Sequence, residues 1–129
     1  MIAPRIRRAM PQRYRYEAGK CKKCGKIFFP PRLVCSDCGS KTFETQVLDR
    51  MGKILTYTII RVPPSQFKDE APYAIGIVEL DGGGRVTTQI VDCDFDKIQI
   101  GMPVKLEFRR IQDEGEAGVI GYGYKCVPV

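Results

Sequence analysis

The stretch that decides the fold is Cys21-Lys22-Lys23-Cys24-Gly25 followed, after nine intervening residues, by Cys35-Ser36-Asp37-Cys38-Gly39. Each Cys-x-x-Cys-Gly unit is a tight turn that presents two sulfurs to one ion. Its glycine permits the positive φ that points backbone N–H groups at those sulfurs. Two such turns supply four ligands for a tetrahedral site, in a segment too small to build a core without a metal. The spacing therefore predicts one structural zinc at Cys21, Cys24, Cys35 and Cys38.

Three alternatives to zinc compete for these cysteines. Disulfides suit a secreted chain, whereas no apolar stretch follows the basic N-terminus to form a secretion signal. A redox Cys-x-x-Cys normally opens a helix and occurs once, and neither condition holds here. Iron fits the same four thiolates and stays open. Cys93 and Cys126 lie outside the spacing, and we interpret them as small buried hydrophobic residues.

The composition bounds the remaining classes of protein. The chain has 129 residues, of which 43% are hydrophobic and 28% charged, as in a soluble globular protein with one ordinary domain or two small ones. No apolar run approaches the roughly 20 residues of a membrane-spanning helix, so we expect a cytoplasmic protein. Histidine is absent, which removes the commonest general base and the Ser–His and Cys–His pairs. We therefore expect no catalytic activity of its own.

Charge is distributed unevenly along the chain. Residues 1–42 contain eleven Lys and Arg against two Asp and Glu, a net charge of +9. Residues 43–129 contain ten against thirteen, a net charge of −3. A basic segment favours an anionic partner, such as nucleic acid, a phosphorylated ligand or an acidic protein surface. The alternative is a solvated basic face that only aids solubility.

The first sixteen residues form a predicted docking segment. Pro4 and Pro11 bracket a stretch long enough for one or two helical turns, which are too short to be stable alone. Apolar residues recur there every four positions, and such a stripe must pack on the chain's own body or on a partner. Arginines and tyrosines, which are enriched in interface hot spots, surround the stripe. The predicted partner-binding surface consists of Ile2, Ile6, Arg7, Arg8, Met10, Arg13, Tyr14 and Arg15.

From Phe43 onward the pattern is one of strands and tight turns. Residues 43–48 and 53–62 are predicted to form one long strand that is kinked or bulged at Gly52. Further strands are expected at 73–80, 85–91, 104–111 and 119–127, with Phe108 facing inward and the glycines at 82–84 in a hairpin turn. Alternate glycines in the last strand leave one face bare, at a barrel corner or where another backbone or a ligand approaches.

Five short strands with a long bent first one predict an OB-type barrel. The expected fold is mainly β: a docking segment with a short helix in 1–16, a rubredoxin-like zinc ribbon in 17–42 and a five-stranded OB-fold barrel in 43–129. A ribbon joined to an OB barrel is typical of nucleic-acid-binding proteins. A groove that follows a phosphate backbone needs a positive lining, however, and the barrel segment is negative. Nucleic-acid binding is therefore disfavoured and stays an alternative.

Several motifs, taken in order, resemble a known family. The chain is similar over nearly its whole length to the two-domain zinc-ribbon/OB-fold proteins associated with acyl-CoA enzymes, and its Pro-Gln-Arg-Tyr-Arg segment looks most like the archaeal members. The motifs are Pro11-Gln12-Arg13-Tyr14-Arg15-Tyr16, Cys21 to Lys26 with Phe29-Pro30-Pro31-Arg32, Cys35 to Cys38, Gly52 to Thr58, Pro72-Tyr73, Val78 to Gly82 and Ile100 to Val104.

The resemblance implies a function. Members of this family accompany thiolase-superfamily enzymes or acyl-CoA hydratases and have no known activity of their own. The archaeal members bridge acetoacetyl-CoA thiolase and hydroxymethylglutaryl-CoA synthase at the start of the mevalonate pathway. We therefore expect a scaffold that holds these two enzymes together, and direct contact with acyl-CoA stays open. The alternatives are a nucleic-acid-binding module and a stand-alone acyl-CoA-binding protein.

Overall fold

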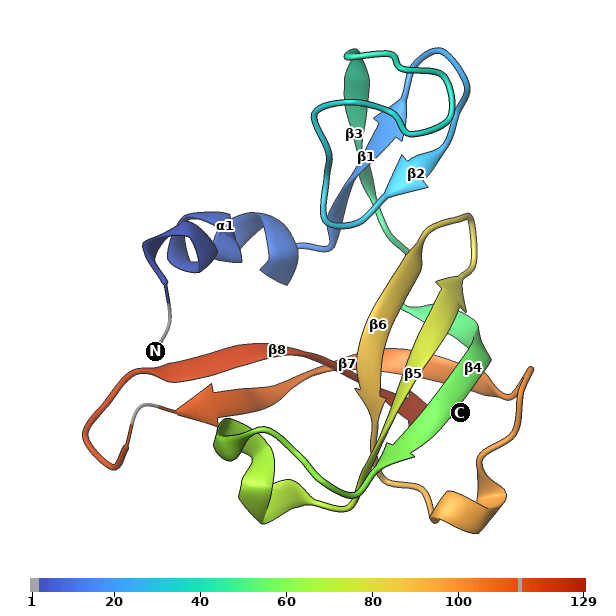
Figure 1. Cartoon of the computed structure of the whole chain (residues 1–129). Coiled ribbons are helices and arrows are strands. Elements are labelled where there is room, and N and C mark those ends of the chain that lie inside the picture. The colour runs from blue at the N-terminus through green and yellow to red at the C-terminus, as the bar shows by residue number, and fades with distance from the viewer. Residues whose placement is uncertain (1–2, 114) are drawn as a thin grey trace.

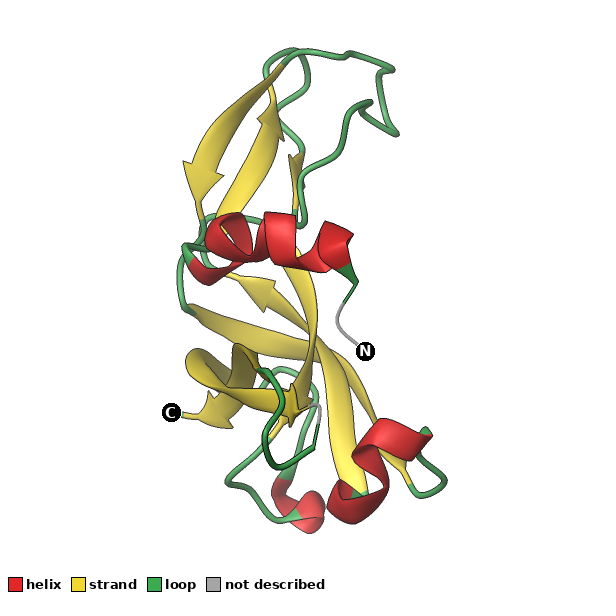
Figure 2. Ribbon diagram, turned by 90° about the vertical axis from the view of Figure 1, so that its left-hand side faces the viewer, coloured by secondary structure: helices red, strands yellow, loops and turns green. Residues whose placement is uncertain are grey.

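The chain folds into a small three-stranded sheet that stands on a closed five-stranded barrel, with a helix beside the junction (Figure 1; Figure 2). The structure is a computed structural model and describes residues 3–113 and 115–129. The expected mainly β fold is confirmed. The elements are α1 (Pro4–Tyr14), β1 (Glu17–Cys21), β2 (Ile27–Phe28), β3 (Phe43–Val47), β4 (Met51–Ile60), η1 (Ser65–Glu70), β5 (Tyr73–Leu80), β6 (Arg85–Ile90), η2 (Phe95–Lys97), β7 (Pro103–Asp113) and β8 (Ile120–Pro128).

Helix α1 is longer than the prolines predicted. It begins at Pro4 and continues through Pro11 to Tyr14, although a proline inside a helix removes one backbone hydrogen bond. The last turn is anchored because the Tyr14 ring packs edge-on against Phe108, with 4.9 Å between the ring centroids. None of the helices in the described part of the chain is long and apolar enough to cross a membrane.

The small sheet contains a strand that we expected in the barrel. β1 lies between β2 and β3 and runs antiparallel to both. β3 pairs with β1 along its whole length, beginning with Phe43 opposite Cys21, so the prediction of one long strand over residues 43–62 is wrong. Phe43 also packs edge-on against Phe28, 6.1 Å between centroids, which holds β3 to the cysteine-rich sheet. The domain division after residue 42 stays a prediction, and this pairing favours a boundary between β3 and β4.

The barrel closes in the strand order β4-β5-β6-β8-β7, which confirms the five-stranded OB-type barrel. Its strand pairs are antiparallel except for β6 with β8. The irregularity expected at Gly52 lies further along, because the register of β4 against β5 shifts between Ile54 and Thr56. Gly52 instead marks a close approach of two backbones: a Cβ there would lie 2.4 Å from the carbonyl oxygen of Glu79.

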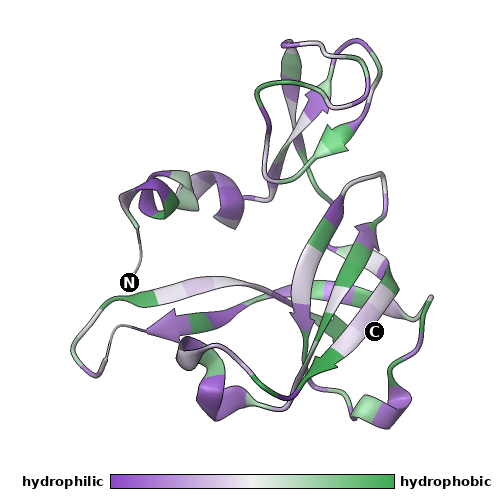
Figure 3. Cartoon of the chain, in the orientation of Figure 1, coloured by the Kyte–Doolittle hydropathy of each residue, from purple (hydrophilic) through white to green (hydrophobic). Residues whose placement is uncertain are grey.

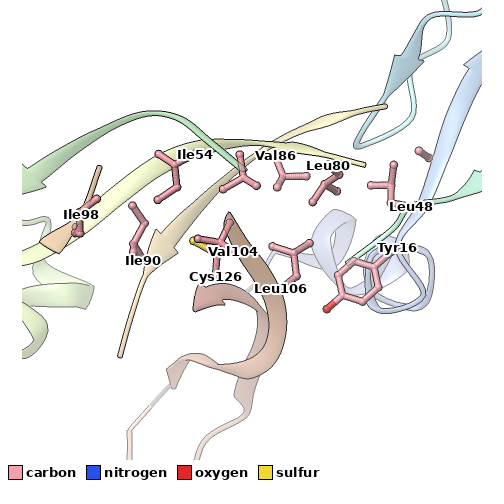
Figure 4. Close-up of a cluster of buried hydrophobic side chains, with 13 residues drawn as sticks. Tyr16, Leu48, Ile54, Leu80, Val86, Ile90, Ile98, Val104, Leu106 and Cys126 are labelled. Carbon is pink, nitrogen blue, oxygen red and sulfur yellow. The ribbon is translucent and has the colours of Figure 1, made fainter. Parts of the chain in front are cut away.

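One hydrophobic core continues from the barrel into the base of the small sheet (Figure 4). The barrel contributes Ile54, Val78 and Val104, each 1% exposed or less. Tyr16 and Leu48, on the two segments that join the sheet to the barrel, are buried in the same cluster. Burying a large apolar side chain contributes about 1.5–3 kcal/mol. The two parts of the molecule are therefore held together by side chains that belong to both.

The glycine run in the β5–β6 turn adds a second contact between the two parts. Gly83 has a φ of 109°, and a Cβ there would lie 2.7 Å from Cδ1 of Ile27 in β2. A Cβ at Gly84 would lie 2.8 Å from Cδ2 of Leu48. The hairpin turn predicted here is confirmed, and its bare backbone lets the small sheet rest directly on it.

Replacing Gly52 with alanine should destabilise the barrel. Because the added Cβ meets backbone rather than a flexible side chain, we expect a loss of about 1–3 kcal/mol in the free energy of unfolding. Chemical denaturation of the Gly52→Ala variant measures it. Lys53→Ala, on an exposed position of the same strand, is the control and should change stability by less than about 0.5 kcal/mol. Equal stability of the two variants would contradict the close approach.

Candidate metal centre and docking surface

The cysteines of the two Cys-x-x-Cys units converge at the end of the small sheet away from the barrel (Figure 1). All four sulfurs lie within 4.8 Å of one another. The Sγ atoms of Cys21 and Cys38 are 3.5 Å apart, and those of Cys24 and Cys35 are 3.4 Å apart. A tetrahedral ion with bonds of about 2.3 Å to sulfur holds its ligands about 3.8 Å apart. The cluster therefore has the size of a zinc site with four thiolates.

The two turns that carry the cysteines have the same local structure. The N–H of Cys21 donates to the carbonyl oxygen of Lys26 at 2.8 Å, and the N–H of Cys35 donates to that of Ser40 at 2.9 Å. The glycine that follows each turn has a positive φ, 82° in the first and 73° in the second. Only glycine adopts this backbone without strain, which explains its position in both units. The tight turns expected from the sequence are confirmed.

The first turn favours a thiolate at Cys21. The backbone N–H of Cys24, together with that of Lys23, lowers the pKa of the Cys21 thiol to about 6. At Cys24 the N–H of Lys26 acts in the same direction, but the sulfur of Cys35 and burial prevail and raise the pKa to about 12. Four sulfurs this close do not all ionise without a cation, and a divalent ion supplies the charge that lets them do so.

Rings and cations surround the sulfur cluster. Phe28 is buried with two of the cysteines in a small core of its own. The Lys26 Nζ and the guanidinium carbon of Arg32 lie 5.2 and 5.1 Å from the centre of the Phe28 ring. Lys26 also forms a 3.0 Å ion pair with Asp37, which ties the first turn to the second. These cations partly offset the negative charge that four thiolates bring to one ion.

The other two cysteines lie in and beside the barrel core. Cys126 is fully buried, and burial raises the pKa of its thiol to about 12. The prediction of a small buried hydrophobic residue is therefore confirmed for Cys126. Cys93 is only half-buried at the edge of the core, and its thiol donates to the carbonyl oxygen of Asp94 at 3.4 Å. The chain has no histidine to activate either thiol as a nucleophile.

The apolar stripe predicted to bind a partner faces a cavity in the protein's own surface. Ile6, Met10, Arg13 and Tyr14 line this cavity from α1, and the opposite wall is the hairpin of β7 and β8. The stripe thus turns toward the barrel hairpin rather than toward the small sheet. Ile2, the remaining residue of the predicted stripe, lies outside the described residues.

The remaining residues of the predicted docking surface are charged. Arg7 and Arg8 are exposed on α1, and Arg15 is exposed just after it. Arg15 forms an ion pair with Glu17 at the start of β1. Figure 3 accordingly shows α1 as mostly hydrophilic, with hydrophobic positions between the charged ones. Partner binding by these residues stays a prediction.

The sequence analysis did not identify the rings of Phe108 and Tyr122 as exposed surface beside α1. Phe108 is 52% exposed, so the prediction that it faces inward is wrong. The alternation that buries Val104 and Leu106 does not reveal that β7 continues to Asp113, past the barrel wall and beneath α1 in Figure 1. Tyr122 of β8 is 45% exposed and stacks on Phe108, with 5.5 Å between ring centroids. The signal that the sequence analysis missed is the length of the paired strands β7 and β8, which extend past the barrel.

Removal of one cysteine from the cluster should remove the metal. A Cys35→Ser variant is expected to retain less than about a tenth of the zinc of the wild-type protein, because a buried ligand is lost and the turn that carries it is disrupted. Hydrogen exchange should then increase over residues 17–47 and much less over the barrel strands. Cys93→Ser is the matched control and should keep one zinc per chain. Iron in place of zinc, or full zinc in the Cys35 variant, would contradict the assignment.

Comparison with known proteins accounts for both parts of the chain. Residues 8–44 match the family described as the ChsH2 rubredoxin-like zinc ribbon domain, and residues 45–109 match the ChsH2 C-terminal OB-fold domain. A DUF35 domain-containing scaffold protein of Methanothermobacter thermautotrophicus is 48% identical over 122 residues. The match covers 94% of this chain and 92% of that protein.

Two other relatives are named for enzymes. The benzoylsuccinyl-CoA thiolase subunit BbsA of Geobacter metallireducens is 29% identical over 109 residues, which cover 84% of this chain and 72% of that subunit. The solved structure of the Ltp2-ChsH2(DUF35) aldolase superposes with a TM-score of 0.68 at 30% identity and covers 94% of this chain and 89% of that one. The ribbon match and the clustered cysteines together assign one structural zinc. The chain belongs to the DUF35 family of zinc-ribbon/OB-fold proteins, whose members include scaffold proteins and a thiolase subunit.

Proposed function

We propose that this chain is a non-catalytic scaffold subunit that holds acetoacetyl-CoA thiolase to hydroxymethylglutaryl-CoA synthase in the cytoplasm. The observation that carries the proposal is the state of the cysteines, the strongest nucleophiles in a chain without histidine. Four of them cluster as a closed metal site, which leaves no open coordination position for a substrate. Cys126 is buried with a raised pKa. The relatives named scaffold proteins and thiolase subunit support the same conclusion.

Holding the thiolase and the synthase together has a physical advantage for the two consecutive condensations. Thiolase condensation of two acetyl-CoA molecules is thermodynamically uphill, and the following condensation pulls it forward. Tethering the two enzymes raises the effective concentration of acetoacetyl-CoA at the second active site without any new chemistry. The subunit needs only rigidity and two binding faces. The shared core around Tyr16 and Leu48 fixes the zinc-stapled sheet against the closed barrel and so supports the rigidity that this role needs.

The docking surface in this proposal is the arginine-rich N-terminal segment. Residues 1–16 contain five arginines and no acidic residue. Complementary charge speeds encounter and fixes register, so the expected partner surface is acidic. The same basic residues are placed to assist an enzyme that handles CoA, a phosphorylated anion. That contact is a secondary part of the proposal.

The isolated subunit should neither condense nor hydrolyse acyl-CoA. We expect the rate of thiol release from acetyl-CoA or acetoacetyl-CoA to equal the buffer rate, because no thiol of the chain has a histidine base. A thiol-detection assay on zinc-loaded protein measures this. Turnover that disappears in a Cys93→Ser variant would overturn the non-catalytic assignment and make Cys93 a candidate nucleophile.

Loss of the docking segment should abolish assembly without unfolding the protein. A chain lacking residues 1–12 keeps Tyr14, Tyr16 and the cysteines, so it should retain its zinc while losing the complex with co-expressed thiolase and synthase on size-exclusion chromatography. Arg7→Glu combined with Arg8→Glu should weaken assembly at least tenfold at low salt and less at high salt, because ions screen the repulsion. Lys41→Glu with Lys53→Glu is the control for equal charge change at exposed positions. Normal assembly of the truncated chain would contradict this docking surface.

A further inference from the structure

A groove with a volume of about 390 Å³ separates α1 from the β7–β8 hairpin. We call it the helix–hairpin groove. One wall is the α1 stripe that contains Ile6 and Met10, and the other wall carries Phe108 and Tyr122. Its floor is the outer surface of the barrel, including Gln89 of β6. The groove thus combines the segment that the sequence marked for docking with a hairpin whose strands the sequence predicted without a docking role.

The rim of the groove is apolar and continuous. Three rings follow one another from the helix to the hairpin: Tyr14 packs edge-on against Phe108, and Phe108 stacks on Tyr122. Ile6 is 41% exposed on the helix side and Tyr122 is 45% exposed on the hairpin. Exposed apolar residues that form one patch, rather than scattered single residues, mark an interaction site.

Two glycines lie along this groove. Gly121 and Gly123 of β8 both line it, at alternate positions that face the same side of the strand. A Cβ at Gly123 would lie 2.9 Å from Cγ1 of Ile111, so a side chain there would displace the wall. The bare position at Gly123 is therefore occupied by the Ile111 side chain of β7.

Gln89, on the floor of the groove, carries a hydrogen-bond acceptor that is unpaired in the described part of the chain. The Oε1 atom of Gln89 is buried and has no hydrogen-bond partner within the described residues. Leaving such an acceptor unsatisfied costs about 1–3 kcal/mol. If the Gln89 side chain turns toward the groove, an N–H group of a bound molecule would recover this loss, so the expected occupant of the groove brings a donor together with apolar surface.

Helix α1 is itself incompletely covered. No residue of α1 is buried, and its N-cap residue Ala3 makes no side-chain capping bond. A helix of 11 residues is marginal in water without tertiary packing on its apolar face. Coverage by a partner would supply the packing that the hairpin alone does not give.

Charge selects the kind of partner. The arginines of the hairpin are neutralised locally, because Arg109 pairs with Asp92 and Arg110 pairs with Asp113. The helix has no acidic residue, and its exposed Arg5 and Arg7 flank the apolar stripe on either side. The groove is therefore bordered along α1 by positive charge, which complements carboxylates.

We propose that the helix–hairpin groove binds an acidic segment of the partner thiolase, which inserts a large apolar side chain between the helix and the hairpin rings. A backbone or side-chain N–H of that segment donates to the Oε1 of Gln89, and its carboxylates lie against the arginines of α1. This inference rests on the proposed scaffold function and names the surface that performs it. Its new element is that the β7–β8 hairpin is half of the docking site.

Replacing the two exposed rings tests the hairpin's part. Phe108→Ser combined with Tyr122→Ser should raise the dissociation constant for purified acetoacetyl-CoA thiolase, measured by titration calorimetry, at least tenfold. Val62→Ser combined with Ile100→Ser is the matched control, since those side chains are 91% and 70% exposed elsewhere on the barrel, and its affinity should stay within about twofold of wild type. Zinc content and thermal midpoint establish that each variant is folded.

Gln89→Leu separates binding from folding. Because the substitution removes an unsatisfied buried acceptor, we expect an unchanged or higher thermal midpoint of the isolated protein. The affinity for thiolase should nevertheless fall severalfold, because the donated hydrogen bond is lost. A purely structural role for Gln89 would move stability and affinity in the same direction, and that result would overturn this part of the proposal.

The failures are distinguishable. If the wild-type protein forms no complex with thiolase, the proposed function fails and the groove assignment falls with it. If wild type binds and the Phe108/Tyr122 variant binds equally well, the groove is wrong and the scaffold function stands. If the isolated protein is a dimer that the same variant converts to a monomer, the groove holds a second copy of this chain, and the thiolase segment is the wrong occupant.

Discussion

Four sulfurs drawn to one ion are the constraint on which the rest of this structure depends. The small sheet has too few apolar residues for a core of its own, and its buried cluster is built around cysteines and Phe28. The ion replaces the missing core, because it fixes two turns that carry all four ligands. β1 then has a fixed position between β2 and β3, and β1 leads directly back to Tyr16 and helix α1. Loss of the ion is therefore expected to affect the orientation of helix α1 as well as the site itself.

Rigidity is transmitted from the metal site to the barrel by shared packing. Tyr16 and Leu48 lie in the barrel core, and the backbone of the β5–β6 turn rests against Ile27 and Leu48. Linked domains with small polar interfaces move relative to each other by default. The continuous apolar contact here removes that freedom, which suits the proposed scaffold role. Catalytic residues are not required for this role, and the chain's composition does not provide the usual ones.

Several groups around α1 lack complete packing or hydrogen bonding. The helix has no buried residue, the rings of Phe108 and Tyr122 are half exposed, and the amide oxygen of Gln89, a residue that lines the same groove, is unsatisfied within the described residues. Each feature alone has a modest energetic cost, and all three lie around one groove. A folded chain tolerates such costs where another molecule completes the packing. The family relationship to scaffold proteins and a thiolase subunit fits a surface of this kind.

The sequence by itself determined the parts whose signals are local. The two Cys-x-x-Cys-Gly units established the metal ligands, because the ligand spacing and the positive-φ glycine belong to one turn each. Strand alternation and turn residues established a mainly β fold with a five-stranded barrel. Tertiary structure decided what depends on non-local pairing. The strand at 43–47 joined the small sheet because its partner is β1, more than twenty residues earlier, and alternation is the same for either partner. Phe108 is exposed because β7 extends past the barrel, and the length of β7 is set by its pairing with β8. Gly121 and Gly123 could be recognised as unusual from the chain alone, but only the folded structure places them in the lining of the groove beside α1.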